Sequence, residues 1–255
     1  MTPSASQKTG RKAQDGPRVL PLGVDGVLVS FGQSLTEAAN RAALAFRAAV
    51  ESESLPGVME TSTSLTSVYL RLDLGQANHA STRPALETLL HSRDWYQAGL
   101  PEGRKLWRIP AVFGTDLAPQ LDEAAALAGV SPGDAVASLC ASPLRVQTIG
   151  FAPGQPYLGE LPPAWDIPRQ TGLTARVPEG ALAVAIRQMV LFSVSTPTGW
   201  RHIGQTALRL FRPDQPDPFL LRPGDEVLFQ PVTRAEFETI RESDPQGGAV
   251  AERLG

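Results

Sequence analysis

The sequence is poor in the residues that build reactive centres and covalent links. It has one cysteine, Cys140, and three histidines in 255 residues, so no internal disulfide can form. The neighbours of Cys140 are small or apolar, which favours a buried, unreactive thiol. No His/Cys/Asp/Glu spacing matches a metal site, no G-x-x-x-x-G-K-[ST] loop is present to hold phosphates, and no G-x-S-x-G turn presents a serine nucleophile. The sequence therefore favours a binding or auxiliary unit over a self-sufficient enzyme.

Charge and hydropathy narrow the classes of partner. The formal net charge is −3 and the pI is about 5.7, and no Lys/Arg block is interleaved with aromatics, so we expect no nucleic-acid partner. No apolar run is long enough to cross a bilayer, so we expect no membrane partner. Residues 1–17 are polar, resemble neither a signal peptide nor an anchor, and are expected to form a disordered tail. These features favour a cytoplasmic location.

The first part of the chain has the pattern of an α+β domain. Ser34 with Glu37 three residues later is a capping box, which predicts the start of a helix. Pro84 suits the first turn of a second helix. Four β-patterns flank these helices: 19–22, 27–31, 58–61 and 68–72. The order ββαββα predicts one sheet with two helices at residues 18–98.

Residues 99–103 have the glycine and proline content of a linker. Two short helices are predicted beyond it, one at 118–127 and one that begins after Ser131 with proline at its first position. A final helix is predicted to open at Thr233, with Glu236 as its capping partner.

Most of the second part of the chain has a strand pattern. Short apolar or β-branched runs are separated by proline and glycine turns: 105–109, 144–148, 181–185, 190–194, 206–211 and 226–229. We therefore predict a β-barrel domain at 104–243, followed by a flexible tail at 244–255.

The stretch Gly150-Phe151-Ala152-Pro153-Gly154-Gln155-Pro156-Tyr157-Leu158-Gly159 predicts a rigid, shaped loop, because glycine allows tight bends and proline fixes φ. Its two aromatics supply contact area at little conformational cost. We predict a recognition rim made of Gly150, Phe151, Pro153, Gly154 and Tyr157. The alternative is a loop that closes a barrel end, with Phe151 inserted into the core.

Five side chains that follow this loop in the sequence are candidates for a ligand groove. The two arginines among them offer planar forks of donors suited to a carboxylate or a phosphate, or else are exposed strand charges. For the tryptophan and the histidine, packing is the alternative to ligand contact. We predict that the substrate is bound by Arg169, Arg176, Gln188, Trp200 and His202. The catalytic residues are left unassigned, and no metal is expected.

Several motifs occur in an order that resembles one family: Gly150 to Gly159, Pro168-Arg169 with Arg176-Val177-Pro178, Ser195 to Thr206 with Gly199-Trp200, and Pro223-Gly224-Asp225. Over about residues 18–232 the chain resembles the B subunit of bacterial 5-oxoprolinase, also known as allophanate hydrolase subunit 1 or the sporulation-kinase inhibitor type. It is similar as well to a lobe of the carboxyltransferase domain of urea carboxylase. The resemblance implies a ferredoxin-like amino-terminal domain followed by a cyclophilin-like β-barrel.

The same resemblance implies one subunit of a heteromeric ATP-dependent amidohydrolase that acts on a small amide or lactam. The expected partner is a homologous barrel subunit, either the C subunit of 5-oxoprolinase or allophanate hydrolase subunit 2, and the 5-oxoprolinase system also has an A subunit. This chain alone is expected to bind no cofactor, and ATP would act in the assembled complex. The alternatives are a non-catalytic regulatory binding protein of the kinase-inhibitor type and a scaffold lobe of a biotin-dependent carboxyltransferase.

The chain departs from the family pattern at positions where glycine is usual. Ile186-Arg187 stands where a Gly-Gly would precede Gln188, and Val190 and Thr198 also take the place of glycines. Side chains at these positions fill space that a ligand or a partner backbone would occupy. We therefore expect a divergent member of the family with a reshaped groove.

Overall fold

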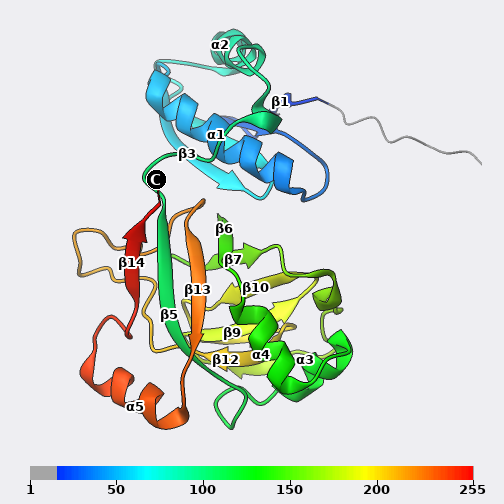
Figure 1. Ribbon diagram of the computed structural model, residues 1–255. Coiled ribbons are helices and arrows are strands. Elements are labelled where there is room, and N and C mark those ends of the chain that lie inside the picture. Colours follow the sequence, from blue (N-terminus) through cyan, green and yellow to red (C-terminus); the bar gives the residue numbers. More distant parts are fainter. Residues whose placement is uncertain (1–15, 255) are drawn as a thin grey trace, which may run out of the picture.

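The computed structural model describes residues 16–254, which form two units, one above the other in Figure 1. Their hydrophobic cores are separate: one lies between Val27 and Trp95 in the sequence and the other between Trp107 and Ala249. The cores fall on either side of the predicted linker at 99–103, whose bounds stay a prediction. Residues 1–15 of the predicted disordered tail lie outside the described part of the chain. Among the described helices, none is both long and apolar enough to cross a membrane.

The amino-terminal unit is a four-stranded antiparallel sheet in the order β1-β2-β4-β3, with two helices on one face. Alternation along the central strands β2 and β4 directs Val29 and Leu70 into the core, where they join Phe46 of α1 and Leu86 of α2. The elements are β1 Arg18–Leu22, β2 Gly26–Ser30, α1 Glu37–Glu53, β3 Val58–Ser64, β4 Ser67–Leu72, α2 His79–His91 and the short 3₁₀ helix η1 Trp95–Gln97.

The starts of both helices differ from the sequence prediction. The predicted Ser34 capping box is wrong, because Thr36 is the N-cap of α1 and accepts a hydrogen bond from the backbone of Ala39. Pro84 lies inside α2 and not in its first turn, since Asn78 and Ser81 form a capping box further upstream. In both cases the start of the helix is set by a capping residue that the prediction did not name, Thr36 for α1 and Asn78 for α2.

The α+β class of the protein is confirmed. The amino-terminal unit begins with the hairpin β1–β2 and has the chain order ββαββα, whereas a ferredoxin-like fold runs βαββαβ. The ferredoxin-like assignment therefore stays a prediction.

The second unit contains a closed barrel. Its eight-stranded sheet has the order β12-β9-β10-β7-β6-β13-β5-β14, and β12 also pairs with β5, so every strand except β14 belongs to a seven-stranded barrel. The barrel is mixed because β13 runs parallel to β5. The strands are β5 Lys105–Phe113, β6 Leu144–Ile149, β7 Pro156–Gly159, β9 Ala181–Ala185, β10 Gln188–Leu191, β12 Arg201–Gln205, β13 Glu226–Pro231 and β14 Val250–Arg253. The predicted β-barrel is confirmed, and its cyclophilin-like character stays a prediction.

Shorter elements complete this unit. Helices α3 and α4 lie beside the barrel, α5 lies at the end far from the amino-terminal unit (Figure 1), and β8 and β11 form a separate two-stranded ribbon. Ser131 caps α4 and Thr233 caps α5 together with Glu236, as predicted. The bounds are α3 Leu121–Ala128, α4 Pro132–Cys140, η2 Pro163–Trp165, β8 Thr174–Val177, β11 Thr196–Thr198 and α5 Arg234–Ser243.

Two predictions about strands and tails are wrong. No strand is formed at 206–210, although the buried Leu208 and Leu210 flank Arg209, because both leucines enter the barrel core from an irregular segment. The predicted flexible tail at 244–255 is wrong for residues 250–253. These residues form β14, which pairs with β5 through the backbone although its side chains are exposed.

The turn between β9 and β10 explains one departure from the family pattern. Ile186 and Arg187, which stand where the resemblance leads us to expect glycines, have φ of +46° and +60°. Two successive left-handed residues between paired strands are typical of a type I′ hairpin turn, which favours glycine or asparagine. The turn therefore keeps the backbone shape expected for glycines, at a conformational cost of roughly 1 kcal/mol per residue.

Candidate functional site

Trp200 packs against the outer face of the barrel, beneath the β8–β11 ribbon. Its side chain is 8 % exposed and shares a small core with Val190 and Phe192. The ring meets Tyr157 edge to face, with centroids 6.1 Å apart, a favourable aromatic geometry. This burial supports the packing alternative, and the predicted substrate contact of Trp200 stays a prediction.

The two predicted arginines are exposed and lie at the ribbon. The Arg176 Nε donates a hydrogen bond to Ser195 Oγ over 2.8 Å, and Ser195 in turn donates to the Val177 carbonyl. The Arg169 guanidinium covers Gly199, where a Cβ would come within 3.4 Å of it. Both side chains thus border the Trp200 core from the solvent side, where their donors are accessible.

His202 is buried inside the protein. Its side chain is 5 % exposed, and its backbone N–H donates to Oε1 of Gln120 at the start of α3. Burial lowers the pKa of His202, and hydrogen bonding to the Gly204 backbone and the Gln205 side chain offsets part of this effect. The ring is therefore neutral at pH 7, which favours a structural role.

We expect acid to destabilise the protein through His202. Because its folded-state pKa lies below the ordinary 6.5, the unfolded chain takes up the proton first, and stability present above pH 6.5 falls as the pH drops below it. The loss approaches about 1.4 kcal/mol for each unit by which the pKa is lowered. Chemical denaturation between pH 7.5 and 5 should show a smaller pH dependence for His202→Gln than for the wild type. The exposed histidine variant His91→Gln is the control. Equal pH dependence in the wild type and His202→Gln would contradict this assignment.

The predicted rim lies on a loop that is only partly exposed, and its role in recognition stays a prediction. Phe151 is 72 % exposed with φ of +72°, so the alternative that inserts it into the core is wrong. Gly154 is buried against the backbone of Leu210, where a Cβ would come within 3.2 Å of its carbonyl oxygen. The loop therefore presents Phe151 to solvent while Gly154 anchors it to the neighbouring segment.

Gln188 is engaged away from the Trp200 core, in a pair that the sequence did not reveal. Its Nε2 donates to Oε1 of Gln147 over 2.8 Å, and both side chains are buried. Among the described residues, no hydrogen bond engages Gln147 Nε2 or Gln188 Oε1, and neither atom is one of the fully buried atoms without a partner, so both keep some solvent access. If the oxygen and nitrogen positions are exchanged in both side-chain amides, the pair still has one free donor beside one free acceptor. We call Gln147 and Gln188 the glutamine pair.

Gly159 leaves the space that the glutamine pair uses. A Cβ on Gly159 would lie 3.0 Å from Gln147 Oε1 and would crowd the pair. Gln147 and Gly159 line a cavity of about 340 Å³ where the barrel meets the amino-terminal helix α1. No signal in the sequence points to Gln147, because a polar residue that alternates with the apolar residues of a strand is normally taken to face solvent.

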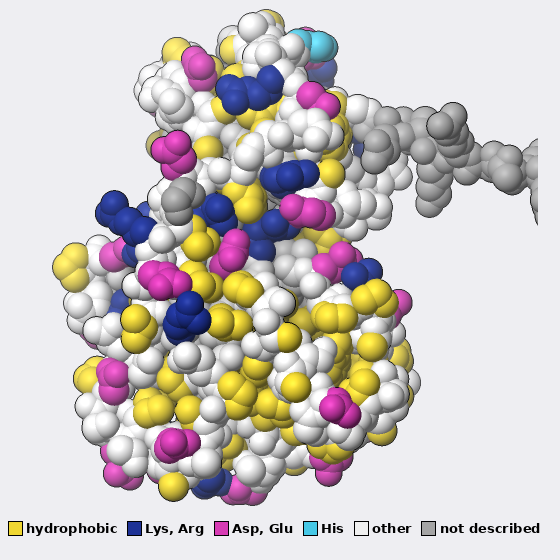
Figure 2. Space-filling model, viewed as in Figure 1, with side chains coloured by type: hydrophobic (Ala, Val, Ile, Leu, Met, Phe, Trp, Pro, Cys, Tyr) yellow, Lys and Arg dark blue, Asp and Glu magenta, His cyan; other side chains and the backbone are white. Residues whose placement is uncertain are grey.

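Ion pairs surround this cavity, which we call the seam cavity. Each of its three lining glutamates has an arginine partner, and Figure 2 shows charges of both signs at the waist between the two units. The pairs are Glu37 with Arg145, Glu160 with Arg187, and Glu226 with Arg104. The charges balance, so the cavity favours a neutral group beside the glutamine pair.

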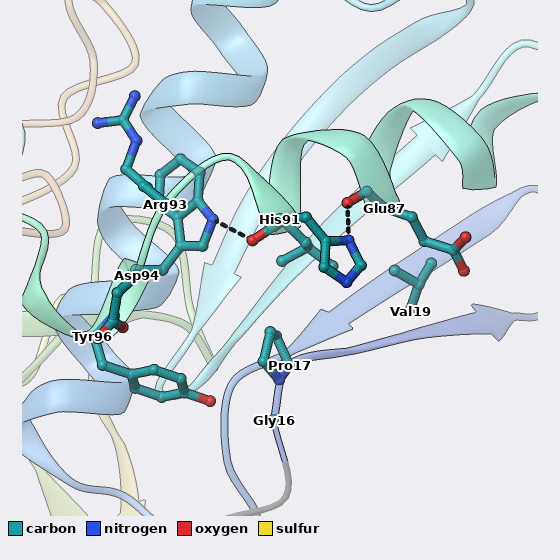
Figure 3. Close-up of a pocket in the computed structure, with 10 residues that line it drawn as sticks. Gly16, Pro17, Val19, Glu87, His91, Arg93, Asp94 and Tyr96 are labelled. Atoms are coloured by element: carbon teal, nitrogen blue, oxygen red, sulfur yellow. Dashed lines mark hydrogen bonds between the residues drawn. The ribbon is translucent and has the colours of Figure 1, made fainter.

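A larger cavity of about 510 Å³ lies in the amino-terminal unit, between the start of β1 and the end of α2 (Figure 3). Its polar groups are used internally: His91 Nδ1 contacts the Glu87 carbonyl over 2.6 Å, and Asp94 accepts from the Tyr96 backbone N–H. None of the predicted site residues lines either this cavity or the seam cavity. The seam cavity is the stronger candidate because its lining residue Gln147 is hydrogen-bonded to the predicted residue Gln188.

Neither a metal centre nor a reactive thiol is found among residues 16–254. No group of three His, Cys, Asp or Glu residues there could hold a metal ion. Burial raises the pKa of the Cys140 thiol to about 12, so its reactive thiolate is scarce near neutral pH.

Comparisons with known proteins agree with one family. Residues 17–221 match the family described as carboxyltransferase domain, subdomain C and D. The 5-oxoprolinase B subunit of Bacillus subtilis (strain 168) is 30 % identical over 232 residues, which cover 87 % of this chain and 95 % of that protein. The 5-oxoprolinase B subunit of Escherichia coli O157:H7 is 37 % identical over 150 residues, which cover 58 % of this chain and 68 % of that protein.

Solved structures share the fold. The crystal structure of TTHA0988 matches with a TM-score of 0.69 at 31 % identity, over 82 % of this chain and 40 % of that chain, so this chain spans about two fifths of its length. The K. lactis urea amidolyase matches with a TM-score of 0.70 over 93 % of this chain and 17 % of its own, and at 19 % identity the likeness concerns the fold alone. The chain therefore belongs to the carboxyltransferase domain family of subdomains C and D, with 5-oxoprolinase B subunits as its relatives.

Proposed function

We propose that this chain is a cytoplasmic subunit of a heteromeric, ATP-dependent amidohydrolase of the 5-oxoprolinase type. It holds the amide or lactam group of a small substrate in the seam cavity and pairs with a homologous barrel subunit, and the complete system also includes an A subunit. ATP is used by the assembled complex, and we assign it no site on this chain. The observation that carries the proposal is the glutamine pair, with its free donor and free acceptor side by side.

The glutamine pair suits a lactam in particular. A lactam ring holds its N–H and C=O on the same edge, so one molecule can donate to Gln188 Oε1 and accept from Gln147 Nε2. Both glutamines are largely buried, but their two unengaged atoms keep some solvent access, so a ligand can reach them. A bound lactam replaces solvent at both atoms with its own hydrogen bonds, whereas an apolar ligand would bury both atoms without partners, which costs free energy. The balanced charges around the cavity also favour the neutral amide group.

The same cavity argues against turnover by this chain alone. Its lining carboxylates, those of Glu37, Glu160 and Glu226, are all engaged by arginines, and the described residues provide no nucleophile with an activating base beside it. The missing groups must come from another chain. The relatives of this protein are named as B subunits of 5-oxoprolinase, which supports a multi-subunit assembly.

Co-expression with two candidate partners, a homologous barrel subunit of the C type and an A subunit, tests this proposal. The three chains should co-purify and open 5-oxoproline with concurrent ATP hydrolysis, and this chain alone should not. Allophanate serves as the second substrate. Failure of the chains to associate, together with no turnover of either lactam or amide, would reject the proposal.

A regulatory binding role is the second candidate, and the exposure of Phe151 favours it. An aromatic side chain that is 72 % exposed on a loop is suited to a protein contact. Affinity purification from the native cell separates the candidates: a homologous barrel protein supports the amidohydrolase, a signalling kinase supports the regulator, and a biotin carrier supports a carboxyltransferase scaffold.

A further inference from the structure

Gln147 is the extra residue of a β-bulge in β6. In the pairing of β6 with β7, Val146 faces Leu158 and Thr148 faces Tyr157, which leaves Gln147 between them without an opposite residue. A bulge redirects the side chain of the extra residue and leaves its backbone outside the ladder. The bulge therefore turns the Gln147 side chain toward Gln188, and its carbonyl needs a partner from elsewhere.

Asn40 of α1 supplies that partner from the other unit. Its Nδ2 donates to the Gln147 carbonyl oxygen over 2.9 Å and to the Leu65 carbonyl oxygen over 2.6 Å. The side chain is 1 % exposed. The two N–H groups of one amide thus join the bulge of the barrel to the β3–β4 turn of the amino-terminal sheet.

Local helix stability does not account for this asparagine. Asparagine has a lower helix propensity than alanine, and Asn40 Oδ1 has no partner among the described residues. Its neighbours on the buried face of α1 are small or apolar, such as Ala39 and Ala43. What the side chain does provide is the contact across the seam.

We propose that Asn40 is a positioning residue, which fixes the bulge at Gln147 and thereby aims the glutamine pair. That the glutamine pair binds a substrate amide rests on the proposed function. The positioning of Gln147 by Asn40 does not depend on that function. The amino-terminal unit then forms part of the site and is more than a neighbouring domain.

Other contacts across the seam provide matched controls. Thr148 Oγ1 donates to the Thr63 carbonyl over 2.9 Å, and Arg145 pairs with Glu37. Thr148→Val removes a buried hydrogen bond between the same two units without touching the Gln147 carbonyl. A general loosening of the seam should therefore affect Thr148→Val and Asn40 variants alike, whereas loss of positioning should affect only the latter.

The test uses NMR signals of the side-chain amides in the full chain, followed during titration with 2-pyrrolidinone. Asn40→Leu, which keeps the size but removes both donors, should shift or broaden the Gln147 and Gln188 NH₂ signals and weaken binding about tenfold, the equivalent of one hydrogen bond. Thr148→Val should leave both signals and the affinity near those of the wild type. Asn40→Ala repeats the measurement if the leucine does not fit.

Unchanged Gln147 and Gln188 signals in the folded Asn40 variants would overturn the inference, as would equal changes in Thr148→Val. If wild-type chain binds no 2-pyrrolidinone, the amide-binding role of the pair fails, while the signals of the unliganded variants still decide whether Asn40 positions Gln147. The two failures are thus distinguishable.

Discussion

Trp200→Ala is expected to lower the free energy of unfolding by about 3–5 kcal/mol, the range for removing a buried aromatic side chain. The indole is 8 % exposed, packs on the outer face of β9 and β10, and meets Tyr157 edge to face. Its removal opens a cavity beneath the β8–β11 ribbon, which the rigid strands cannot fill. Denaturant unfolding of the purified chain measures the change.

Two controls separate packing from ligand contact at Trp200. Trp200→Phe keeps an aromatic ring and should recover most of the stability. Leu173→Ala removes an apolar side chain that is 69 % exposed on the same surface and should change stability by less than about 0.5 kcal/mol. A Trp200→Ala chain with nearly wild-type stability but lost substrate binding would show that the indole faces the substrate.

Gln188→Leu is expected to reduce kcat/KM of the assembled complex for 5-oxoproline by roughly 10- to 100-fold. The leucine cannot accept from the lactam N–H, and it leaves Gln147 Oε1 without its donor at 2.8 Å. Leaving a buried polar group unpaired costs about 1–3 kcal/mol, which corresponds to this range. Steady-state kinetics of the co-purified complex provide the measurement.

Gln230→Leu is the matched control for this substitution. Gln230 is exposed on β13, so the same chemical change there should leave kcat/KM within about twofold of the wild type. Equal activity of Gln188→Leu and Gln230→Leu complexes, both intact, would show that the glutamine pair takes no part in substrate binding.

The sequence predicted the elements whose signals are local. The capping residues of α4 and α5 and the apolar run of β9 are each specified within a few positions. Where two local signals competed, the prediction failed, as at Ser34 and Thr36. Leu208 and Leu210 have the spacing of a strand but lie in an irregular segment, and the sequence pattern alone could not distinguish the two structures.

The site itself depends on contacts between distant segments, and this limited what the sequence could predict. Gln188 was named, but its partner Gln147 lies 41 residues away, and Asn40 lies 107 residues from the carbonyl that it binds. The residue types around Gln147 do not indicate that a bulge forms there. His202 and Trp200 were named as candidates, yet their burial depends on the β8–β11 ribbon and α3, which only the fold brings over them.

A crystal structure of the chain or its complex with 2-pyrrolidinone bound tests the central claim most directly. The account predicts the lactam N–H within about 3.2 Å of Gln188 Oε1 and the lactam oxygen at the same range from Gln147 Nε2. A lactam bound instead beside Arg176 and Trp200, with the seam cavity free of it, would contradict the account.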